Sequence, residues 1–339
     1  MTGSIEPVVV VENDELIGEH RTPVSFQFLG PFRAMRGTVE IELGAPRERR
    51  LLIALLRSAG HWISRDELVT WVWDVPPTHP RALDEVAGFL RNGSLAELGL
   101  SDQFTSRDGR CRLDVDSDCV DAHRLKRLAA RADEVRGVAH RDLLRAALGL
   151  RHGEPLEDIG GQRIDAYRGE LTARYRRVEI LYNQLEVRTG RGATRLQDLE
   201  RLHEQDPVDV LTAGLYMCAL YLAGNPTRAD AVRGAHVEQL FEYGLEVPRQ
   251  LADLQQAMLS GASDLGVAGA YFLGGPFRPI NDADPDAEVP PESEELPTTA
   301  QDRVAAIHST VTTNNGVVNA IGSITTDYLN LGIDKRRSG

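Results

Sequence analysis

Residues 46–73 read PRERRLLIALLRSAGHWISRDELVTWVW, and they carry the clearest secondary-structure signals of the chain. Leucine and alanine residues recur in its first half at the spacing of one helix face, and Pro46 and Gly60 stand where a helix tolerates a first-turn proline and where a helix ends. A second helix is expected after Ser64, whose hydroxyl can accept a hydrogen bond from the first turn, with Glu67 at the capping-box spacing. The stretch therefore predicts two consecutive helices joined by a tight turn.

A third helix and a hairpin follow. Residues 81–91, RALDEVAGFLR, place four apolar residues on one helix face. Residues 104–115, FTSRDGRCRLDV, contain Asp108-Gly109, a dipeptide typical of the tight turn between two antiparallel strands. Three helices closed by a hairpin describe a winged helix-turn-helix.

The regions on either side complete the fold class. Residues 25–43 alternate between apolar and polar side chains, as short strands do, and predict a small β-sheet before the helices. From about residue 120 to residue 262 the pattern is helical throughout, with small residues where helices cross closely, which favours a tetratricopeptide-like stack of two or three helix pairs. The fold class is therefore mainly α: a winged helix-turn-helix with a small β-sheet and a wing, then a tetratricopeptide-like all-α domain, then a β-prone C-terminal tail.

Composition shifts along the chain suggest five segments. The acidic, proline-rich stretch near residues 277–299 is typical of a disordered tether. The expected limits are a flexible N-terminus at 1–23, the winged helix-turn-helix at 24–117, the helical domain at 118–262, a disordered acidic linker at 263–300 and the tail at 301–339.

Charge and motif content restrict the function classes. The net charge of −13 argues against non-specific nucleic-acid binding by the whole chain, but residues 25–125 carry nearly balanced numbers of arginines and acids. Three cysteines suit a reducing cytoplasm, and the sequence contains no candidate membrane span, no plausible signal peptide and no phosphate-binding loop of the GxxxxGK[ST] type. Cys111 and Cys119 lack a second ligand pair for zinc. We therefore expect no catalytic residue, no metal, no cofactor and no enzymatic activity.

The order of several short motifs resembles one family. The matching positions are Leu29-Gly30-Pro31, Leu43-Gly44, Pro46-Arg47, Arg49, Leu51-Leu52, Ser64, Leu68 and Trp73. They resemble the N-terminus of the Streptomyces antibiotic regulatory protein family, and segments such as VDAHRLKRLA and LERLHEQDPVDVLTAGLYMCALYLAGNPTRADAV resemble its bacterial transcriptional activator domain. The resemblance implies a transcriptional regulator that binds double-stranded DNA through an OmpR/PhoB-type winged helix. It also implies a helical domain that forms a homodimer or contacts RNA polymerase or another protein.

The third helix departs from the family pattern. At this position the family pattern resembles NTLQTYVSRLRRAL. In the family this segment is a basic helix that lies in the major groove of DNA. This chain instead has Asp84 and Glu85 where phosphates would approach, and Phe89 where an arginine is usual. The arginines that remain as expected DNA contacts are Arg81 and Arg91 on the third helix, Arg47, Arg49 and Arg50 on the first, and Arg107, Arg110 and Arg112 on the wing. Two hypotheses stay open: a reduced DNA reader, or a winged helix retained as a packing or protein-binding module.

The tail adds a second open question. Residues 311–331 are rich in β-branched residues and asparagine and contain one charged residue, Asp327. They weakly resemble the amyloid-signalling motifs of bacterial immune-type proteins, which predicts self-assembly, whereas addition of a strand to a partner is the alternative. The leading hypothesis is a dimeric DNA-binding activator. The rival is a signalling adaptor or scaffold with a degenerate DNA-binding domain.

Overall fold

The computed structural model describes residues 23–279 of the 339-residue chain. The expectations for the N-terminal segment, for most of the acidic linker and for the tail at 301–339 fall on residues 1–22 and 280–339, outside the described part.

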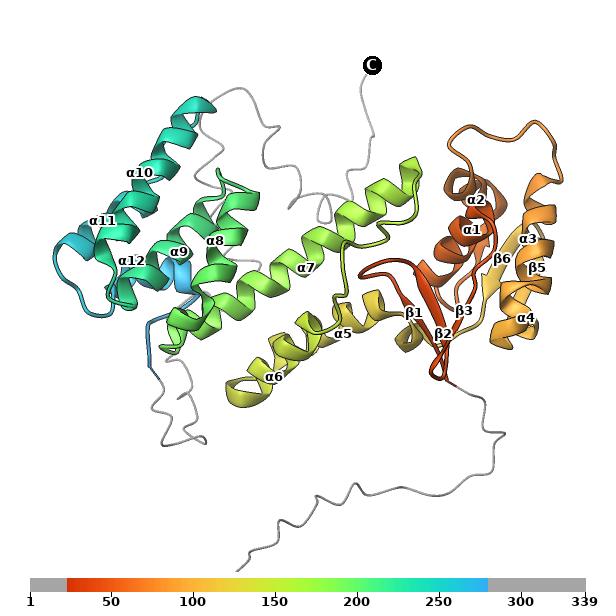
Figure 1. Ribbon diagram of the computed structural model, residues 1–339, viewed down its shortest axis with the longest axis horizontal. Helices are drawn as coiled ribbons and strands as arrows, with labels where there is room; N and C mark the ends of the chain where they lie inside the picture. Colours follow the sequence, from red (N-terminus) through yellow and green to blue (C-terminus); the bar gives the residue numbers. More distant parts are fainter. Residues whose placement is uncertain (1–22, 280–339) are drawn as a thin grey trace, which may run out of the picture.

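The first half of the described chain forms a winged helix-turn-helix (Figure 1). An antiparallel three-stranded sheet in the order β1-β2-β3 precedes the helices, and a second sheet in the order β4-β6-β5 closes them. The elements are β1 Val24–Gln27, β2 Arg33–Arg36, β3 Val39–Ile41, α1 Pro46–Arg57, β4 Ile63–Ser64, α2 Arg65–Val72, α3 Ala82–Asn92, α4 Ser94–Leu98, β5 Phe104–Arg107 and β6 Arg110–Leu113. The fold predicted for this half is confirmed.

Local sequence signals explain where these elements begin and end. The Ser64 hydroxyl accepts a hydrogen bond from the Glu67 backbone N–H at 3.2 Å and caps α2 as predicted. The hairpin turn places Asp108 at a φ of 51° and Gly109 at 68°, which is the left-handed pair that a two-residue hairpin turn requires. Helix α3 stops at Gly93, whose N–H donates to the Phe89 carbonyl at 2.8 Å.

The second half is a stack of helices. They are α5 Asp121–Glu134, α6 Gly137–Leu148, α7 Gln162–Arg188, α8 Leu196–Gln205, α9 Val210–Leu222, α10 Pro226–Glu242, α11 Arg249–Leu259 and α12 Gly266–Leu273. Among residues 23–279 no helix combines the length and apolar character that a membrane crossing requires.

Helix α12 corrects the sequence prediction, which placed residues from 263 onward in a disordered linker. Phe272 of α12 is fully buried and packs over Gly214 of α9, where a Cβ atom would overlap its ring. The acids that suggested a tether begin only after residue 281, and the segment GVAGAYFL is apolar enough to be buried. The prediction was wrong because the glycine and alanine residues of this segment are also typical of loops, and only packing against another helix distinguishes the two cases.

Two hydrophobic cores meet along α7. The first runs from Phe26 to Leu185 and joins the winged helix to α5, α6 and most of α7. The second runs from Val187 to Leu273 and is built by the end of α7 together with α8, α9, α10, α11 and α12. Figure 1 shows α7 as a long diagonal helix with the winged helix at one end and α8–α12 at the other. The winged helix therefore shares its core with the first helices of the helical domain.

Hydrogen bonds from backbone N–H groups to aspartate carboxylates hold the winged helix and the helical domain together. The buried Asp121 carboxylate, at the start of α5, accepts from the N–H groups of Phe28 at 2.8 Å and Leu29 at 3.0 Å. Burial raises the pKa of Asp121, and these two N–H groups act in the opposite direction. At the other end of the junction, Asp74 accepts from the Gln162 N–H at the first residue of α7, at 2.7 Å. The orientation of the winged helix, residues 24–113 and called here the head, is thus set by polar contacts as well as by packing.

Two histidines lie together in the second part of the helical domain. His203 of α8 and His236 of α10 have ring centroids 5.5 Å apart. His236 is fully buried, and its Nδ1 lies 2.8 Å from the Pro207 carbonyl oxygen. Burial lowers the pKa of both imidazoles, which the neighbouring Asp209 carboxylate counteracts in part. Both rings are therefore neutral in the folded protein at neutral pH.

This pair predicts that stability falls on mild acidification. The unfolded chain takes up protons at an ordinary histidine pKa of about 6.5, whereas the folded chain does so only at lower pH. The contribution is thus complete above about pH 6.5 and is lost below it, by on the order of 1 kcal/mol between about pH 7.5 and about pH 5.5. Urea unfolding across this range should show the fall. It should be smaller in a variant with both His203→Gln and His236→Gln, and an equal slope in the two proteins would contradict the assignment.

Candidate nucleic-acid interface

Helix α3 presents one polar face to solvent. Leu83, Ala87 and Leu90 are buried on the inner face. The outer face carries Arg81, Glu85, Phe89 and Asn92, all exposed. Residues spaced by three or four lie above one another on a helix, so these four form a single stripe, called here the α3 outer stripe. Figure 1 shows α3, β5 and β6 on the side of the head far from α7.

The acids of α3 have partners. Asp84 accepts from Arg65 of α2 through both guanidinium nitrogens, at 2.6 and 3.2 Å. The hydrogen bonds that Arg65 donates to Asp84 raise the pKa of Arg65. Glu85 lies 3.8 Å from the His79 Nδ1. Because the Asp84 charge is compensated, it repels an approaching phosphate less than its sequence position suggests.

Arg65 also connects α3 to the wing. Its backbone N–H donates to the Gly109 carbonyl at the hairpin turn, at 2.9 Å, while its side chain holds Asp84. Arg65 was not among the residues expected from the sequence to be functional. Its position just after the Ser64 cap indicates a helix start, and nothing in the local pattern indicates a partner 19 residues away.

The wing arginines differ in how freely they can reach a ligand. Arg107 and Arg110 flank the turn and are exposed, with the Arg107 Nε 3.2 Å from the Asp108 carboxylate. Arg112 is partly buried, lies 3.3 Å from Asp114 and stacks over Trp62 at 5.1 Å. Five of the predicted arginines therefore lie on α3 or the wing: Arg81, Arg91, Arg107, Arg110 and Arg112.

The three arginines predicted on α1 have partners away from α3 and the wing, and two of them, Arg49 and Arg50, lie at the junction with the helical domain. Arg49 bonds the Asp158 carboxylate and, at 3.3 Å, the Phe32 carbonyl. Arg50 reaches the Val72 carbonyl at 3.2 Å and Asp74 at 3.3 Å. Arg47 lies over the Trp73 ring, 5.7 Å from its centroid. Arg49 and Arg50 could contact DNA only by leaving these partners.

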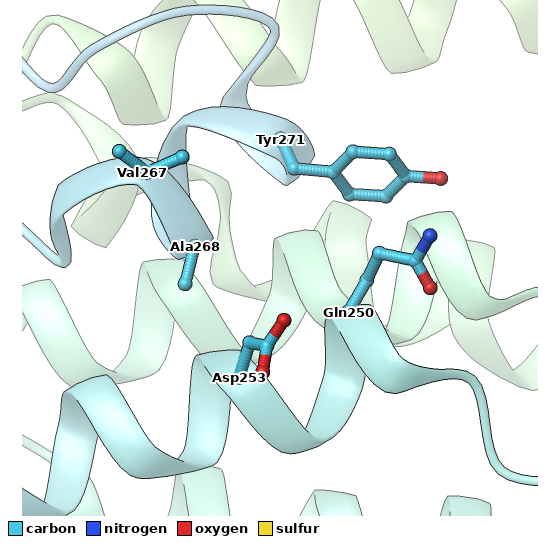
Figure 2. Close-up of a pocket in the computed structure, with 5 residues that line it drawn as sticks. All are labelled: Gln250, Asp253, Val267, Ala268 and Tyr271. Carbon is cyan, nitrogen blue, oxygen red and sulfur yellow. The ribbon is translucent and has the colours of Figure 1, made fainter. Parts of the chain in front are cut away.

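A second surface feature lies in the helical domain. Figure 2 shows the residues that line an open depression between α11 and α12, which are Gln250, Asp253, Val267, Ala268 and Tyr271. The volume of this depression is about 400 Å³. Val267 is 90% exposed, although it is apolar. An exposed apolar residue beside a depression marks a candidate protein-binding surface rather than a catalytic site. The described residues contain no group of three or more His, Cys, Asp or Glu side chains placed to hold a metal ion.

These features define a winged-helix protein with a stack of helices behind the winged helix. Residues 115–259 match the model of the bacterial transcriptional activator domain family. The chain is 28% identical to the regulatory protein AfsR of Streptomyces griseus over 263 residues, which are 74% of this chain and 27% of AfsR. It is 26% identical to the regulatory protein DnrI of Streptomyces peucetius over 253 residues, covering 70% of this chain and 92% of DnrI.

One solved structure shares the fold. It is Mycobacterium tuberculosis EmbR in complex with a low-affinity phosphopeptide, with a TM-score of 0.66, 20% identity, and coverage of 74% of this chain and 69% of that one. The resemblance to the Streptomyces antibiotic regulatory proteins is thereby confirmed, and the match to the bacterial transcriptional activator domain model falls on the helical region. The chain spans about a quarter of the length of AfsR.

Proposed function

We propose that the protein is a DNA-binding transcriptional regulator of the antibiotic regulatory protein type, an activator that acts in the cytoplasm, where the DNA is. The observation that carries the proposal is that the α3 outer stripe and the wing residues Arg107 and Arg110 are exposed on one side of a winged helix. The relatives named above are regulatory proteins, which supports the same class. The mechanism is recognition without bond-making or bond-breaking.

In this proposal the arginines have three roles. Arg91, Arg107 and Arg110 are exposed and supply phosphate contacts, which fix the position of the head on the duplex. Arg81 begins the α3 outer stripe and lies where it can reach a base edge or a phosphate. Arg49 and Arg50 hold the head against the helical domain. Phosphate neutralisation releases counterions, so binding must weaken as salt rises.

This mechanism predicts a measurable change in salt dependence. The double variant Arg91→Ala, Arg110→Ala should bind a pool of random-sequence duplexes more weakly, with a slope of log K against log salt reduced by about 2. Fluorescence anisotropy at salt concentrations between about 50 and about 200 mM gives both quantities. Arg145→Ala, on an exposed position of α6, should leave both unchanged. If the wild-type protein fails to bind duplex at the lowest salt, DNA recognition is excluded.

We further propose that the protein dimerises through the depression between α11 and α12. An exposed valine beside a tyrosine and a polar rim resembles the centre and rim of a protein interface. Val267→Asp would place a charge in that centre and should raise the dimer dissociation constant at least tenfold, measured by sedimentation equilibrium. Val138→Asp, the same change at an exposed valine of α6, should have no effect. A dimer that persists in Val267→Asp would exclude this surface, and a monomeric wild type would exclude dimerisation.

The helical domain is also the proposed contact for RNA polymerase or another protein of the transcription machinery. The rival function, a signalling adaptor or scaffold, is favoured by the same exposed apolar residues of the helical domain. It becomes the leading function if duplex binding is absent. Self-assembly through residues 311–331 stays a prediction on the part of the chain that the structure does not describe.

A further inference from the structure

Phe89 is the unusual member of the α3 outer stripe. Its side chain is 67% exposed, although α3 offers a buried face one position away, at Leu90. The polar residues Glu85 and Asn92 lie one turn away on either side. Next to it, Gly88 is open: a Cβ there would meet nothing within 4 Å. The ring therefore stands out from the helix beside a position with no side chain, which leaves room for a flat surface to approach closely.

The surroundings of Phe89 distinguish between partners. The centre of a protein interface is a contiguous apolar patch. Phe89 is instead a single aromatic ring in a stripe of an arginine, a glutamate and an asparagine. The edges of base pairs in the major groove have this mixed character, because hydrogen-bonding groups alternate with the methyl group of thymine.

We propose that Phe89 is a specificity-determining residue that contacts the 5-methyl group of a thymine in the major groove. The inference rests on the proposed DNA-binding function and deepens it, since it names the base that one residue prefers. Apolar side chains, phenylalanine among them, make this contact when a helix lies in the major groove. Arg81 and Asn92 of the α3 outer stripe are of the types that hydrogen-bond guanine and adenine edges.

An aromatic residue at position 89 is compatible with DNA binding, although an arginine there would add a phosphate contact. An arginine raises affinity for every sequence and makes binding more dependent on salt. A phenylalanine contributes no charge, so its contribution is independent of salt and depends on the base. Phe89→Arg should therefore tighten binding to random-sequence duplexes, steepen the salt dependence and reduce discrimination between sequences.

The test uses the smallest possible change in the ligand. Duplexes selected by the full chain from a random-sequence pool are resynthesised with uracil at each thymine in turn, which removes only the methyl group. At one thymine position in each sequence that a single protein copy contacts, replacement by uracil should lower the wild-type affinity about fourfold. This factor corresponds to the free energy of burying one methyl group. Phe89→Ala should bind the thymine and uracil duplexes equally. Phe241→Ala, the same change at a phenylalanine of α10 that is also 67% exposed, should retain the difference.

The outcomes separate this inference from the function on which it rests. If Phe89→Ala still distinguishes thymine from uracil, or if salt-dependent binding enriches no sequence, the assignment of Phe89 is overturned while DNA binding stands. If the wild-type protein binds no duplex in a salt-dependent manner, the proposed function itself fails. Because Phe89 is exposed, the variants should fold, and their circular dichroism spectra and thermal unfolding should match the wild type.

Discussion

Replacing Asp121 by alanine is expected to lower the free energy of unfolding by about 3 kcal/mol. The carboxylate is buried and accepts two backbone N–H groups, those of Phe28 and Leu29, which are themselves fully buried. Removal leaves both donors without a partner in the core, and each orphaned donor costs about 1–3 kcal/mol. Urea or guanidinium unfolding followed by circular dichroism measures the change.

Two companion variants show whether the loss comes from these hydrogen bonds. Asp133→Ala changes an exposed aspartate at the other end of α5 and should alter stability by less than about 0.5 kcal/mol. Asp121→Asn keeps one acceptor oxygen and should fall between wild type and Asp121→Ala. A loss for Asp121→Ala no larger than that of Asp133→Ala would mean that packing alone joins the head to the helical domain.

Phe272→Ala is expected to cost about 4 kcal/mol, the typical loss for a fully buried phenylalanine. Its ring fills the space that Gly214 leaves between α9 and α12, so truncation creates a cavity that the backbone cannot easily close. Because the ring belongs to the second core, the loss should appear first as faster amide hydrogen exchange in α9 and α12.

Phe241→Ala is the matched control for stability. It deletes the same atoms at a position of α10 that is 67% exposed and should change the free energy of unfolding by less than about 0.5 kcal/mol. If both variants lose the same stability, Phe272 does not anchor α12, and the boundary expected at residue 262 would describe the folded domain better than the helix seen here.

The winged helix was predictable because its signals are local. The Ser64 cap, the first-turn Pro46 and the Asp108-Gly109 turn each act within a few residues, so their effect on the backbone is the same before and after the chain folds. The exposed arginines of α3 and the wing were found for the same reason: helix periodicity and hairpin geometry determine which side chains point outward.

The buried polar contacts of α7 show the limit of this reasoning. Glu179, Asn183 and Glu186 read as ordinary solvent-facing helix positions, yet all three are buried. Their partners are Arg201 of α8, Arg195 just before it, and Arg141 of α6, the last of which reaches Glu186 through two hydrogen bonds. Whether a charged residue on a helix is exposed or buried depends on which element packs against that face. The periodicity of the helix sequence does not indicate which element this is.

By itself the sequence determined the winged helix, its caps and turns, the helical character of the region behind it and the family that it resembles. Only the tertiary structure decided that α12 is a packed helix, that Asp84 is neutralised by Arg65, and that Arg49 is held by Asp158, 109 residues away, rather than lying with the arginines of α3 and the wing. The physical reason is range. Backbone preferences and capping bonds act between near neighbours in the chain, whereas burial and charge pairing depend on distances that exist only after the chain has folded.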